Sequence, residues 1–141
     1  MGGRALVGAA AWSAALLAVV SAAPQDTGTV IARGKYLAEN AGVCHDCHTP
    51  RLESGEFDKS KWMKGSVMPF APLKPIPNWH KTAPDLTPSG TLFKKWGAEA
   101  LVKFLETGKT PKDTFAGPPM LPYRFSRADA VALVEYLKTL P

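Results

Sequence analysis

The sequence predicts an all-α domain in which helices near both ends of the chain enclose long, proline-rich loops. Apolar residues recur at helical spacing towards both ends, no stretch alternates apolar and polar residues over a useful strand length, and 13 prolines interrupt the chain. With 141 residues, the chain is long enough for one hydrophobic core but not for two. We therefore expect one domain, preceded by a targeting segment.

The first 22 residues are typical of a secretory signal peptide. Arg4 supplies the positive start, residues 6–20 form an apolar stretch, and small residues around Ala22 suit cleavage after it. We therefore expect residues 1–22 to be a signal peptide, residues 23–141 to be the mature domain, and the protein to be periplasmic. The apolar stretch is only slightly shorter than the ~17–25 residues that span a bilayer. A retained membrane anchor is thus the alternative, whereas cleavage would leave no membrane span.

The first helix of the mature domain is expected over residues 29–38. The residues that follow, 40–42, are Asn, Ala and Gly, which tolerate a left-handed backbone and are predicted to end the helix. Gly34 lies within this helix, where glycine costs about 1 kcal/mol relative to alanine. Close approach of another helix would explain why a glycine occupies that position.

The middle of the chain, residues 50–88, shows little periodicity. Its prolines remove backbone donors and block the interior of helices. A loop this long is uncommon in a compact domain unless it surrounds another body. We expect it to wrap around a cofactor.

Two helices are expected towards the C-terminus. Residues 98–107 place apolar side chains at helical spacing, and Gly108 stands where a C-terminal cap belongs. After a second loop over residues 109–125, Ser126 is expected to cap the last helix, with Asp129 completing a carboxylate variant of the capping box. The apolar stripe of this last helix consists of Ala130, Leu133, Val134, Leu137 and Leu140.

The chain is basic, with a formal net charge of +5 and a pI near 9.3. This charge indicates an acidic partner surface or anionic lipid headgroups. It does not indicate nucleic acid, because no basic helix and no basic patch interleaved with aromatic residues occurs. The lysines that would form either a docking rim or simply a soluble surface are Lys59, Lys61, Lys64, Lys94, Lys95, Lys103, Lys109 and Lys112.

The chemistry of the sequence is concentrated in residues 44–48, Cys-His-Asp-Cys-His. This C-x-x-C-H pattern is typical of c-type haem attachment, in which two thiols add to the porphyrin vinyl groups and the next imidazole ligates the iron. A redox-active dithiol would need a thioredoxin-like sheet, for which the sequence shows no strands. A zinc site would need further ligands, and only two cysteines occur. The pattern therefore predicts one haem c, held by Cys44 and Cys47 with His48 as its proximal ligand.

Several short motifs follow one another along the mature chain, at residues 34–38, 44–50, 83–88, 104–108, 120–123 and 136–140. In this order they resemble a class I monohaem c-type cytochrome, of the bacterial periplasmic kind that accompanies dehydrogenases. The resemblance implies the cytochrome c fold, with Pro-rich loops around one haem and crossing N- and C-terminal helices. Gly34 would then face Tyr136 or Leu137. Asp85 departs from the Asn that is frequent in such domains, and residues 57–79 match the pattern poorly.

The resemblance also implies a sixth iron ligand, which we assign to Met120. This residue lies in a Pro-Pro-Met-Leu-Pro loop ahead of the last helix, where the family has its axial methionine. Packing in the core is the alternative for Met120, and His80 would be the ligand in a site with two histidines. His45, between the cysteines, is expected to face solvent. Met63 and Met68 are expected to pack in loops.

Five other residues have two interpretations each. Trp62, Trp79, Trp96 and Tyr123 either flank the haem or pack in a small core. Arg51 either pairs with a haem propionate or is solvated.

Ligation by one histidine and one methionine favours Fe(II) and leaves no open position at the iron. The expected activity is therefore electron transfer, by an electron carrier and not an enzyme. The expected donor is a periplasmic dehydrogenase or a quinol-oxidising complex, and the expected acceptor an oxidase or reductase, with the protein diffusing as a monomer. A dedicated electron-accepting subunit of one dehydrogenase is the alternative, and a haem enzyme or gas sensor with an open distal site is the third possibility.

Overall fold

The computed structural model describes Met1 and residues 26–141, so the predicted signal peptide, apart from Met1, lies outside the described residues. The chain is mostly helical with one small two-stranded sheet, which confirms the predicted all-α class. Its elements in order are α1 (Thr27–Tyr36), the π-helical turn η1 (Leu37–Ala41), α2 (Cys44–His48), the 3₁₀ turn η2 (Lys59–Lys61), β1 (Ser66–Val67), β2 (Thr82–Ala83), α3 (Thr91–Thr107) and α4 (Arg127–Lys138).

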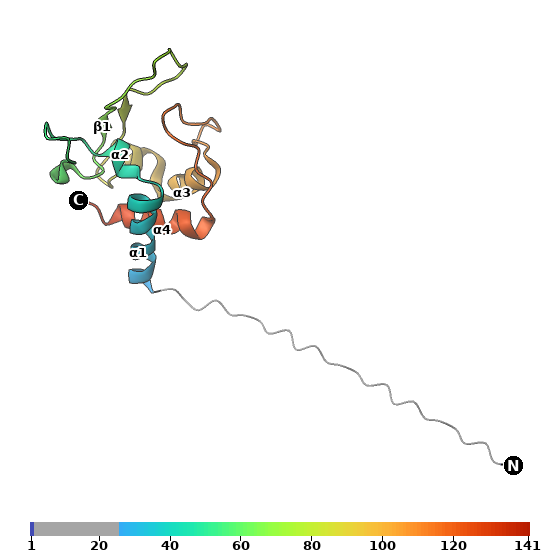
Figure 1. Cartoon of the computed structure of the whole chain (residues 1–141). Helices are drawn as coiled ribbons and strands as arrows, with labels where there is room; N and C mark the ends of the chain where they lie inside the picture. The colour runs from blue at the N-terminus through green and yellow to red at the C-terminus, as the bar shows by residue number, and fades with distance from the viewer. Residues whose placement is uncertain (2–25) are drawn as a thin grey trace.

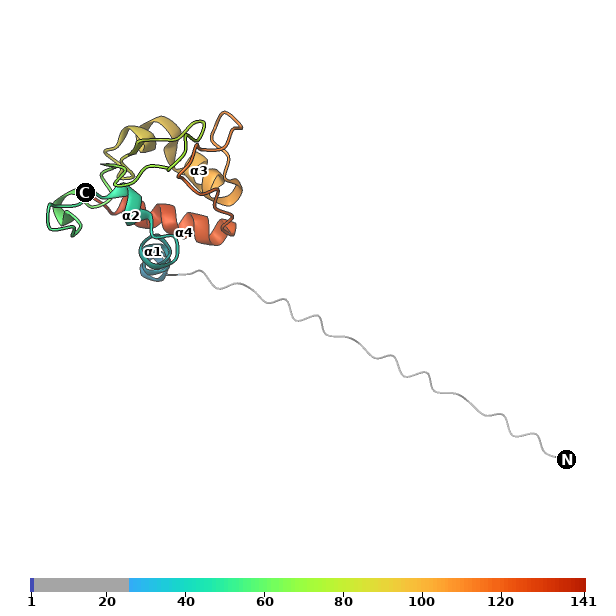
Figure 2. The same ribbon diagram turned by 45° about the horizontal axis from the view of Figure 1, so that its top comes forward.

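The first and last helices cross each other, and Gly34 lies at the crossing. α1 runs steeply across α4 in Figure 1, and after the turn of the view α1 is seen nearly end-on beside α4 in Figure 2. A Cβ atom placed on Gly34 would overlap the backbone carbonyl of Ala132 and would lie 2.9 Å from the Cβ atom of Tyr136. Glycine is required here because the two helices meet without room for a side chain. The expected approach of Gly34 to Tyr136 is confirmed.

Replacing Gly34 by Ala is expected to destabilise the haem-loaded protein by ~1–3 kcal/mol, the usual cost of overpacking. The clash involves backbone atoms of α4, so only a shift of the whole helix can relieve it. Gly28→Ala is the control, because a Cβ atom on Gly28 of the same helix would meet only the Asp26 side chain, at 3.0 Å. Urea unfolding followed by circular dichroism should show a lower midpoint for Gly34→Ala alone. Equal midpoints for the two variants would contradict the tight crossing.

The hydrophobic core is formed mainly by α3 and α4, with contributions from η1 and the long loop. Met63 of the loop is fully buried, and its N–H donates to the Thr49 hydroxyl at 3.0 Å. The apolar stripe predicted for α4 is confirmed, with four members buried and the last half-buried: Ala130, Leu133, Val134, Leu137 and Leu140.

The backbone conformation at the end of the first helix differs from the prediction. A π-helical turn prolongs α1, and Gly42 after it keeps a right-handed backbone with φ −90°. The left-handed residue is Val43, with φ 43°. The expectation that residues 40–42 supply a left-handed stop is therefore wrong. The turn is held instead by the Gly42 N–H, which donates to the Leu37 carbonyl at 2.7 Å.

The two C-terminal helices match the prediction except where α3 begins. α3 begins at Thr91, and Gly97, with φ 74° and ψ 169°, separates its first part from the rest. This break explains why the helical spacing in the sequence starts only at residue 98. Gly108 is left-handed, with φ 74°, and caps α3 as predicted. The Ser126 hydroxyl accepts the Asp129 N–H at 3.2 Å, which confirms the predicted cap of α4.

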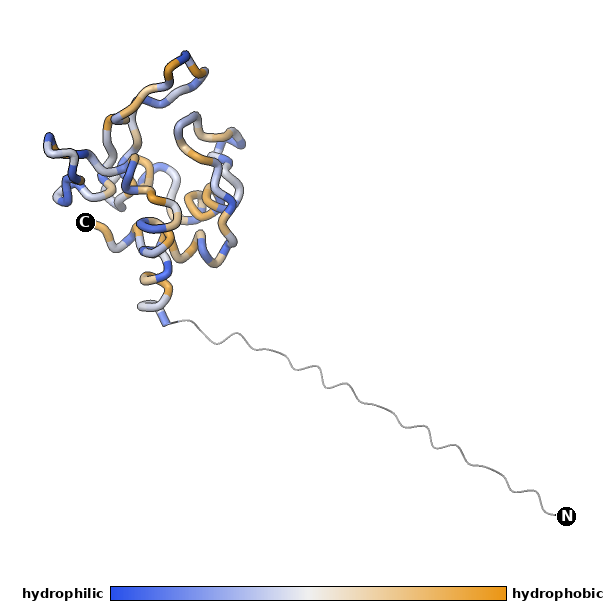
Figure 3. Tube along the Cα trace, viewed as in Figure 1, coloured by the Kyte–Doolittle hydropathy of each residue, from blue (hydrophilic) through white to orange (hydrophobic). Residues whose placement is uncertain are grey.

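Long connections make up much of the remaining structure. β1 pairs with β2 in antiparallel fashion, and the chain from 66 to 83, which we call the arm, stands away from the helices (Figure 1). Hydrophobic residues line α4 and also extend along the arm (Figure 3). Across the part of the chain that the structure describes, no helix combines the length and the hydrophobicity needed to cross a membrane.

Candidate cofactor-attachment site

The C-x-x-C-H motif forms the short helix α2, directly after the left-handed Val43. Residues three and four apart lie on one face of a helix. The helical backbone therefore places the thiols of Cys44 and Cys47 and the imidazole of His48 side by side. Thr49, with an extended backbone, ends the helix. The sequence pattern alone predicted these three residues as a unit, and the local structure is consistent with that prediction.

The imidazole of His48 is oriented by a backbone carbonyl. Only 5% of the residue is exposed, and its Nδ1 lies 2.7 Å from the Pro84 carbonyl oxygen. Because a carbonyl can only accept, Nδ1 carries the proton and Nε2 keeps its lone pair. Burial lowers the pKa of His48, and the bond to Pro84 opposes this effect in part. A neutral ring with a fixed tautomer is the form that binds a metal.

The two cysteines are free and protonated at neutral pH. Burial raises the pKa of Cys44 to about 11, and it also raises the pKa of Cys47, with the Asp46 carboxylate as a second cause. Redox-active dithiols have the opposite property, a lowered thiol pKa. The environment of these thiols thus argues against disulfide exchange as their role.

Tyr123 joins the loop that carries Met120 to the turn before Cys44. Its hydroxyl donates to the Gly42 carbonyl at 2.5 Å, and its ring stacks on Phe125 with centroids 5.1 Å apart. Burial, with a smaller contribution from the two nearby cysteines, raises the pKa of Tyr123 to about 12, so the hydroxyl stays a donor. The sequence suggested a role beside the haem for Tyr123 but did not predict this link.

Met120 is partly buried and packs against the same hydrophobic core that Cys44 borders. Its N–H lies 3.3 Å from the Gly117 carbonyl, within the proline-rich loop. This position is compatible both with a thioether ligand and with a packing residue. The assignment of Met120 as sixth ligand stays a prediction.

His80 is exposed and lies beside the loop of Met120. Its N–H donates to the Pro118 carbonyl at 2.7 Å. A Cβ atom on Gly117 would lie 2.8 Å from the His80 Nε2 atom. The alternative ligand and the predicted one therefore come from neighbouring segments.

The prediction that His45 faces solvent is wrong. Only 15% of its side chain is exposed, because residues 57–62 fold back over α2. Its ring stacks on Trp62 at a centroid distance of 5.0 Å and meets the ring of Phe57 edge-on at 4.9 Å. Within residues 26–141, the buried Nδ1 of His45 has no hydrogen-bond partner. The sequence offered no signal for this cluster, since residues 57–79 matched the family pattern poorly.

Trp62 connects the His45 cluster to the crossing of the terminal helices. Its Nε1–H donates to the Tyr136 hydroxyl at 3.4 Å, and that hydroxyl donates to the Glu39 carboxylate. Burial raises the pKa of Tyr136 to about 12, and the bond to Glu39 adds to the shift. On its outer side, the Lys59 ammonium lies 3.9 Å from the centroid of the Trp62 ring. These contacts show a packing role for Trp62.

The other aromatic candidates also have protein partners. Trp96 meets Phe104 edge-on in the core at 5.5 Å, and Trp79 meets Phe70 in the arm at 5.8 Å. Arg51, the remaining candidate, also has a protein partner, because its guanidinium lies over the ring of Phe57, 4.0 Å from the ring centroid.

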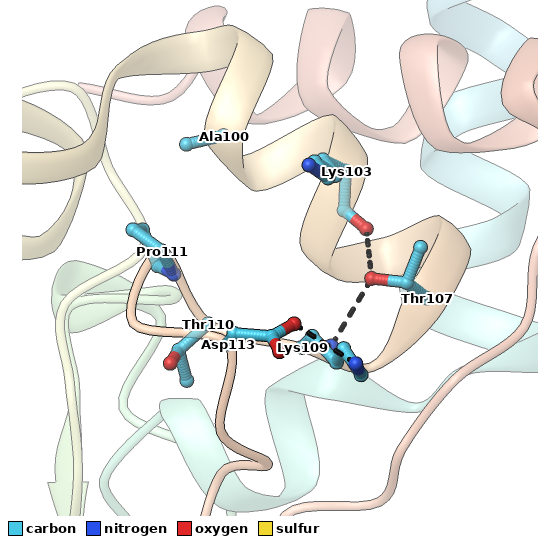
Figure 4. Close-up of a pocket in the computed structure, with 7 residues that line it drawn as sticks. All are labelled: Ala100, Lys103, Thr107, Lys109, Thr110, Pro111 and Asp113. Carbon is cyan, nitrogen blue, oxygen red and sulfur yellow. Dashed lines mark hydrogen bonds and ion pairs between the residues drawn. The ribbon is translucent and has the colours of Figure 1, made fainter.

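A hollow at the end of α3 plays no part in this arrangement (Figure 4). Thr107 donates to the Lys103 carbonyl at 2.7 Å and accepts from the Lys109 N–H at 3.2 Å, while the Lys109 ammonium pairs with Asp113 at 2.9 Å. These bonds all join residues that line the hollow to one another. The lining residues include none of the four predicted site residues: Ala100, Lys103, Thr107, Lys109, Thr110, Pro111 and Asp113.

The residues of α2 fit a c-type haem. Two protonated thiols and one neutral imidazole share a helical face, and within residues 26–141 the His48 Nε2 atom is not used by another hydrogen bond. Over the same residues, no three His, Cys, Asp or Glu side chains gather in a metal-binding arrangement. A zinc site at Cys44 and Cys47 would therefore lack further ligands from the described residues. Haem attachment requires only the two thiols and the His48 imidazole.

Comparison with known proteins agrees with this assignment. The cytochrome c family model matches residues 31–141. The chain is 34% identical over 114 residues to a protein named diheme cytochrome c-type from Cereibacter sphaeroides, a match that covers 77% of this chain and 35% of that protein.

Two further relatives are named as parts of dehydrogenases. The chain is 33% identical over 117 residues to the cytochrome c subunit of a quinone alcohol dehydrogenase from Gluconobacter oxydans, covering 79% of this chain and 24% of the relative. It is 32% identical over 117 residues to the fructose dehydrogenase cytochrome subunit from Gluconobacter japonicus, covering 77% and 22%. The chain thus spans about a third or less of the length of these relatives.

Proposed function

The chain belongs to the cytochrome c family, and on this premise we propose that it carries single electrons through one haem with histidine and methionine ligands. Cys44 and Cys47 hold the porphyrin, His48 is the proximal ligand and Met120 the sixth ligand. The observation that carries the proposal is the buried His48 ring, whose Nδ1–H donates to the Pro84 carbonyl at 2.7 Å beside two protonated thiols.

The number of thiols supports the proposal of a single haem on this chain. The sequence contains two cysteines, both in one C-x-x-C-H motif, which is enough for one attachment. The relative whose name refers to two haems is much longer than the matched region.

The bound haem supplies a one-electron Fe(III)/Fe(II) couple. His48 is held in one tautomer by the Pro84 carbonyl, which keeps its Nε2 lone pair available and raises its basicity. Met120 offers a neutral, soft thioether that favours the reduced state. If His48 and Met120 both bind the iron, no position would remain for a substrate. This supports an electron carrier over a haem enzyme or a gas sensor.

Two arrangements with redox partners are proposed. In the first, the protein diffuses between a donor, such as a periplasmic dehydrogenase or a quinol-oxidising complex, and an accepting oxidase or reductase. In the second, it is the electron-accepting subunit of one dehydrogenase, and the names of two relatives support this arrangement. Copurification with a dehydrogenase from the native host distinguishes them. The signal-like residues 1–22 support a periplasmic location for either.

Covalent attachment is tested by mass. Expressed with a periplasmic haem-maturation system, the protein is expected to weigh one haem more than its chain and to stay red after acid-acetone extraction. Replacing both Cys44 and Cys47 by Ala should remove the colour on extraction, because no thioether bond remains. The control is the exposed His80→Ala variant, which should keep its haem. Loss of colour from the unaltered protein on extraction would overturn the attachment.

A further inference from the structure

The arm, residues 66–83, projects from the domain, and hydrogen bonds hold its base. The Met68 N–H donates to the Lys81 carbonyl at 2.9 Å, which continues the pairing of β1 with β2. The His80 N–H bonds the Pro118 carbonyl at 2.7 Å, which attaches the arm to the second loop. Beyond these bonds the chain stands clear of the body (Figure 1). The arm is thus held at its base both by its own strand pairing and by the second loop.

The outer part of the arm exposes large apolar side chains. Leu73 is fully exposed, Phe70 is 50% exposed and Ile76 is 44% exposed. The hydropathy colouring shows hydrophobic residues reaching along the arm towards its end (Figure 3). Large apolar side chains gathered on a projecting surface typically mark a binding site, since their exposure to water costs free energy. Packing within the described domain does not account for them.

Prolines stiffen this exposed segment. Pro69, Pro72 and Pro75 each fix the backbone angle φ near about −65°, so fewer backbone conformations are open to this segment. Phe70 and Trp79 meet edge-on across the arm at a centroid distance of 5.8 Å. A segment that is already ordered loses little conformational entropy when it binds. The apolar side chains can therefore bind a partner at a small cost in conformational entropy.

The stretch of sequence that contains the arm carries only positive charges. Residues 59–84 contain no Asp or Glu and five lysines: Lys59, Lys61, Lys64, Lys74 and Lys81. Within residues 26–141, neither Lys74 nor Lys81 forms an ion pair. These two cations of the arm are available to an anionic partner that also accepts apolar side chains.

We propose that the arm binds the surface of a bilayer containing anionic lipids, with Phe70, Leu73 and Ile76 inserted at the headgroup level. Lys74 and Lys81 bind lipid phosphates, and the amphipathic ring of Trp79 lies at the interface, where Trp side chains are enriched. A projecting tip fits a deformable lipid surface, whereas a protein partner would need a pocket of matching shape. The arm would hold the electron carrier at the membrane on which its partners act.

This contact is independent of the proposed redox function and of any N-terminal anchor. α1 begins on the side of the body away from the arm (Figure 1). Variants that share one N-terminus therefore isolate the contribution of the arm. Intact mass records whether that N-terminus has been cleaved.

The test is sedimentation of the haem-loaded protein with vesicles of equal parts phosphatidylglycerol and phosphatidylcholine, in about 0.1 M salt. We expect binding to these vesicles and much weaker binding to pure phosphatidylcholine. Leu73→Asp is expected to weaken binding about tenfold or more, because it removes one apolar side chain from the bilayer surface and adds a negative charge that anionic lipids repel. Replacing Lys74 and Lys81 together by Gln should weaken it by a similar factor.

Leu52→Asp is the matched control. Leu52 is also exposed and apolar but lies outside the arm, so the same change of charge there should leave binding nearly unaltered. The proposal is overturned if the unaltered protein does not sediment with the anionic vesicles. It is equally overturned if Leu73→Asp binds the anionic vesicles as tightly as Leu52→Asp does. Such a result would also be obtained if a retained N-terminal segment provided all of the binding. The visible spectrum of both variants should stay that of the unaltered protein, which confirms their folding.

Discussion

Replacing Met120 by Ala is expected to convert the iron from low spin to high spin and to let carbon monoxide bind the reduced protein. The thioether is the predicted sixth ligand, and alanine cannot replace it. The weak far-red band of sulfur-to-iron charge transfer should disappear from the ferric spectrum. The reduction potential should fall by on the order of 0.1 V, a modest part of the ~0.8 V range that axial ligands cover. Visible spectroscopy and redox titration measure both effects.

Met63→Ala is the control that separates ligation from packing. Met63 is fully buried, so its truncation should cost about 2–5 kcal/mol of stability and leave the spectrum unchanged. If Met120→Ala behaves in the same way, Met120 is a packing residue. A spectrum of two imidazole ligands in the unaltered protein would transfer the role to His80, which lies beside the same loop. High-spin iron in the unaltered protein would favour the enzyme or sensor class.

Replacing His48 by Ala is expected to abolish the low-spin spectrum and to lower the stability of the folded protein. The change removes the proximal ligand and leaves a cavity in place of a buried ring, which by itself costs about 3–5 kcal/mol, by analogy with aromatic residues. It also leaves the Pro84 carbonyl without its donor. Circular dichroism and visible spectroscopy of the purified protein measure both losses.

Added imidazole distinguishes a ligand from a purely structural residue. It should restore part of the low-spin spectrum of His48→Ala, because a free imidazole can occupy the cavity and bind the iron. His80→Ala, in which an exposed histidine is removed, is the control and should resemble the unaltered protein. A low-spin spectrum of His48→Ala without added imidazole would contradict the assignment of the proximal ligand.

Several features of the fold were predictable because short stretches of sequence encode them. The cap at Ser126 depends on a residue three positions away, and the left-handed cap at Gly108 depends on one residue type. The apolar stripe of α4 follows from helical spacing alone. The grouping of Cys44, Cys47 and His48 on α2 is likewise a consequence of their spacing, so the most specific part of the site required no knowledge of tertiary structure.

Other features could not be predicted, because the contacts that create them join distant parts of the chain. His45 was expected in solvent, but residues 57–62 cover it and bring Trp62 against its ring. Local pattern also missed the start of α3, where the break at Gly97 interrupts the helical periodicity.

By itself the sequence determined the all-α class, the C-x-x-C-H unit and the need for close packing at Gly34. The tertiary structure decided which distant residues contact Gly34 and the C-x-x-C-H unit. It placed the Ala132 carbonyl against Gly34, the Pro84 carbonyl on His48, and the Tyr123 hydroxyl on the Gly42 carbonyl, 81 residues away in sequence. The physical reason is that caps and helical faces depend on neighbours within one or two turns, which a sequence displays directly. Contacts between distant segments depend on how the whole chain closes around its core, which no short pattern records.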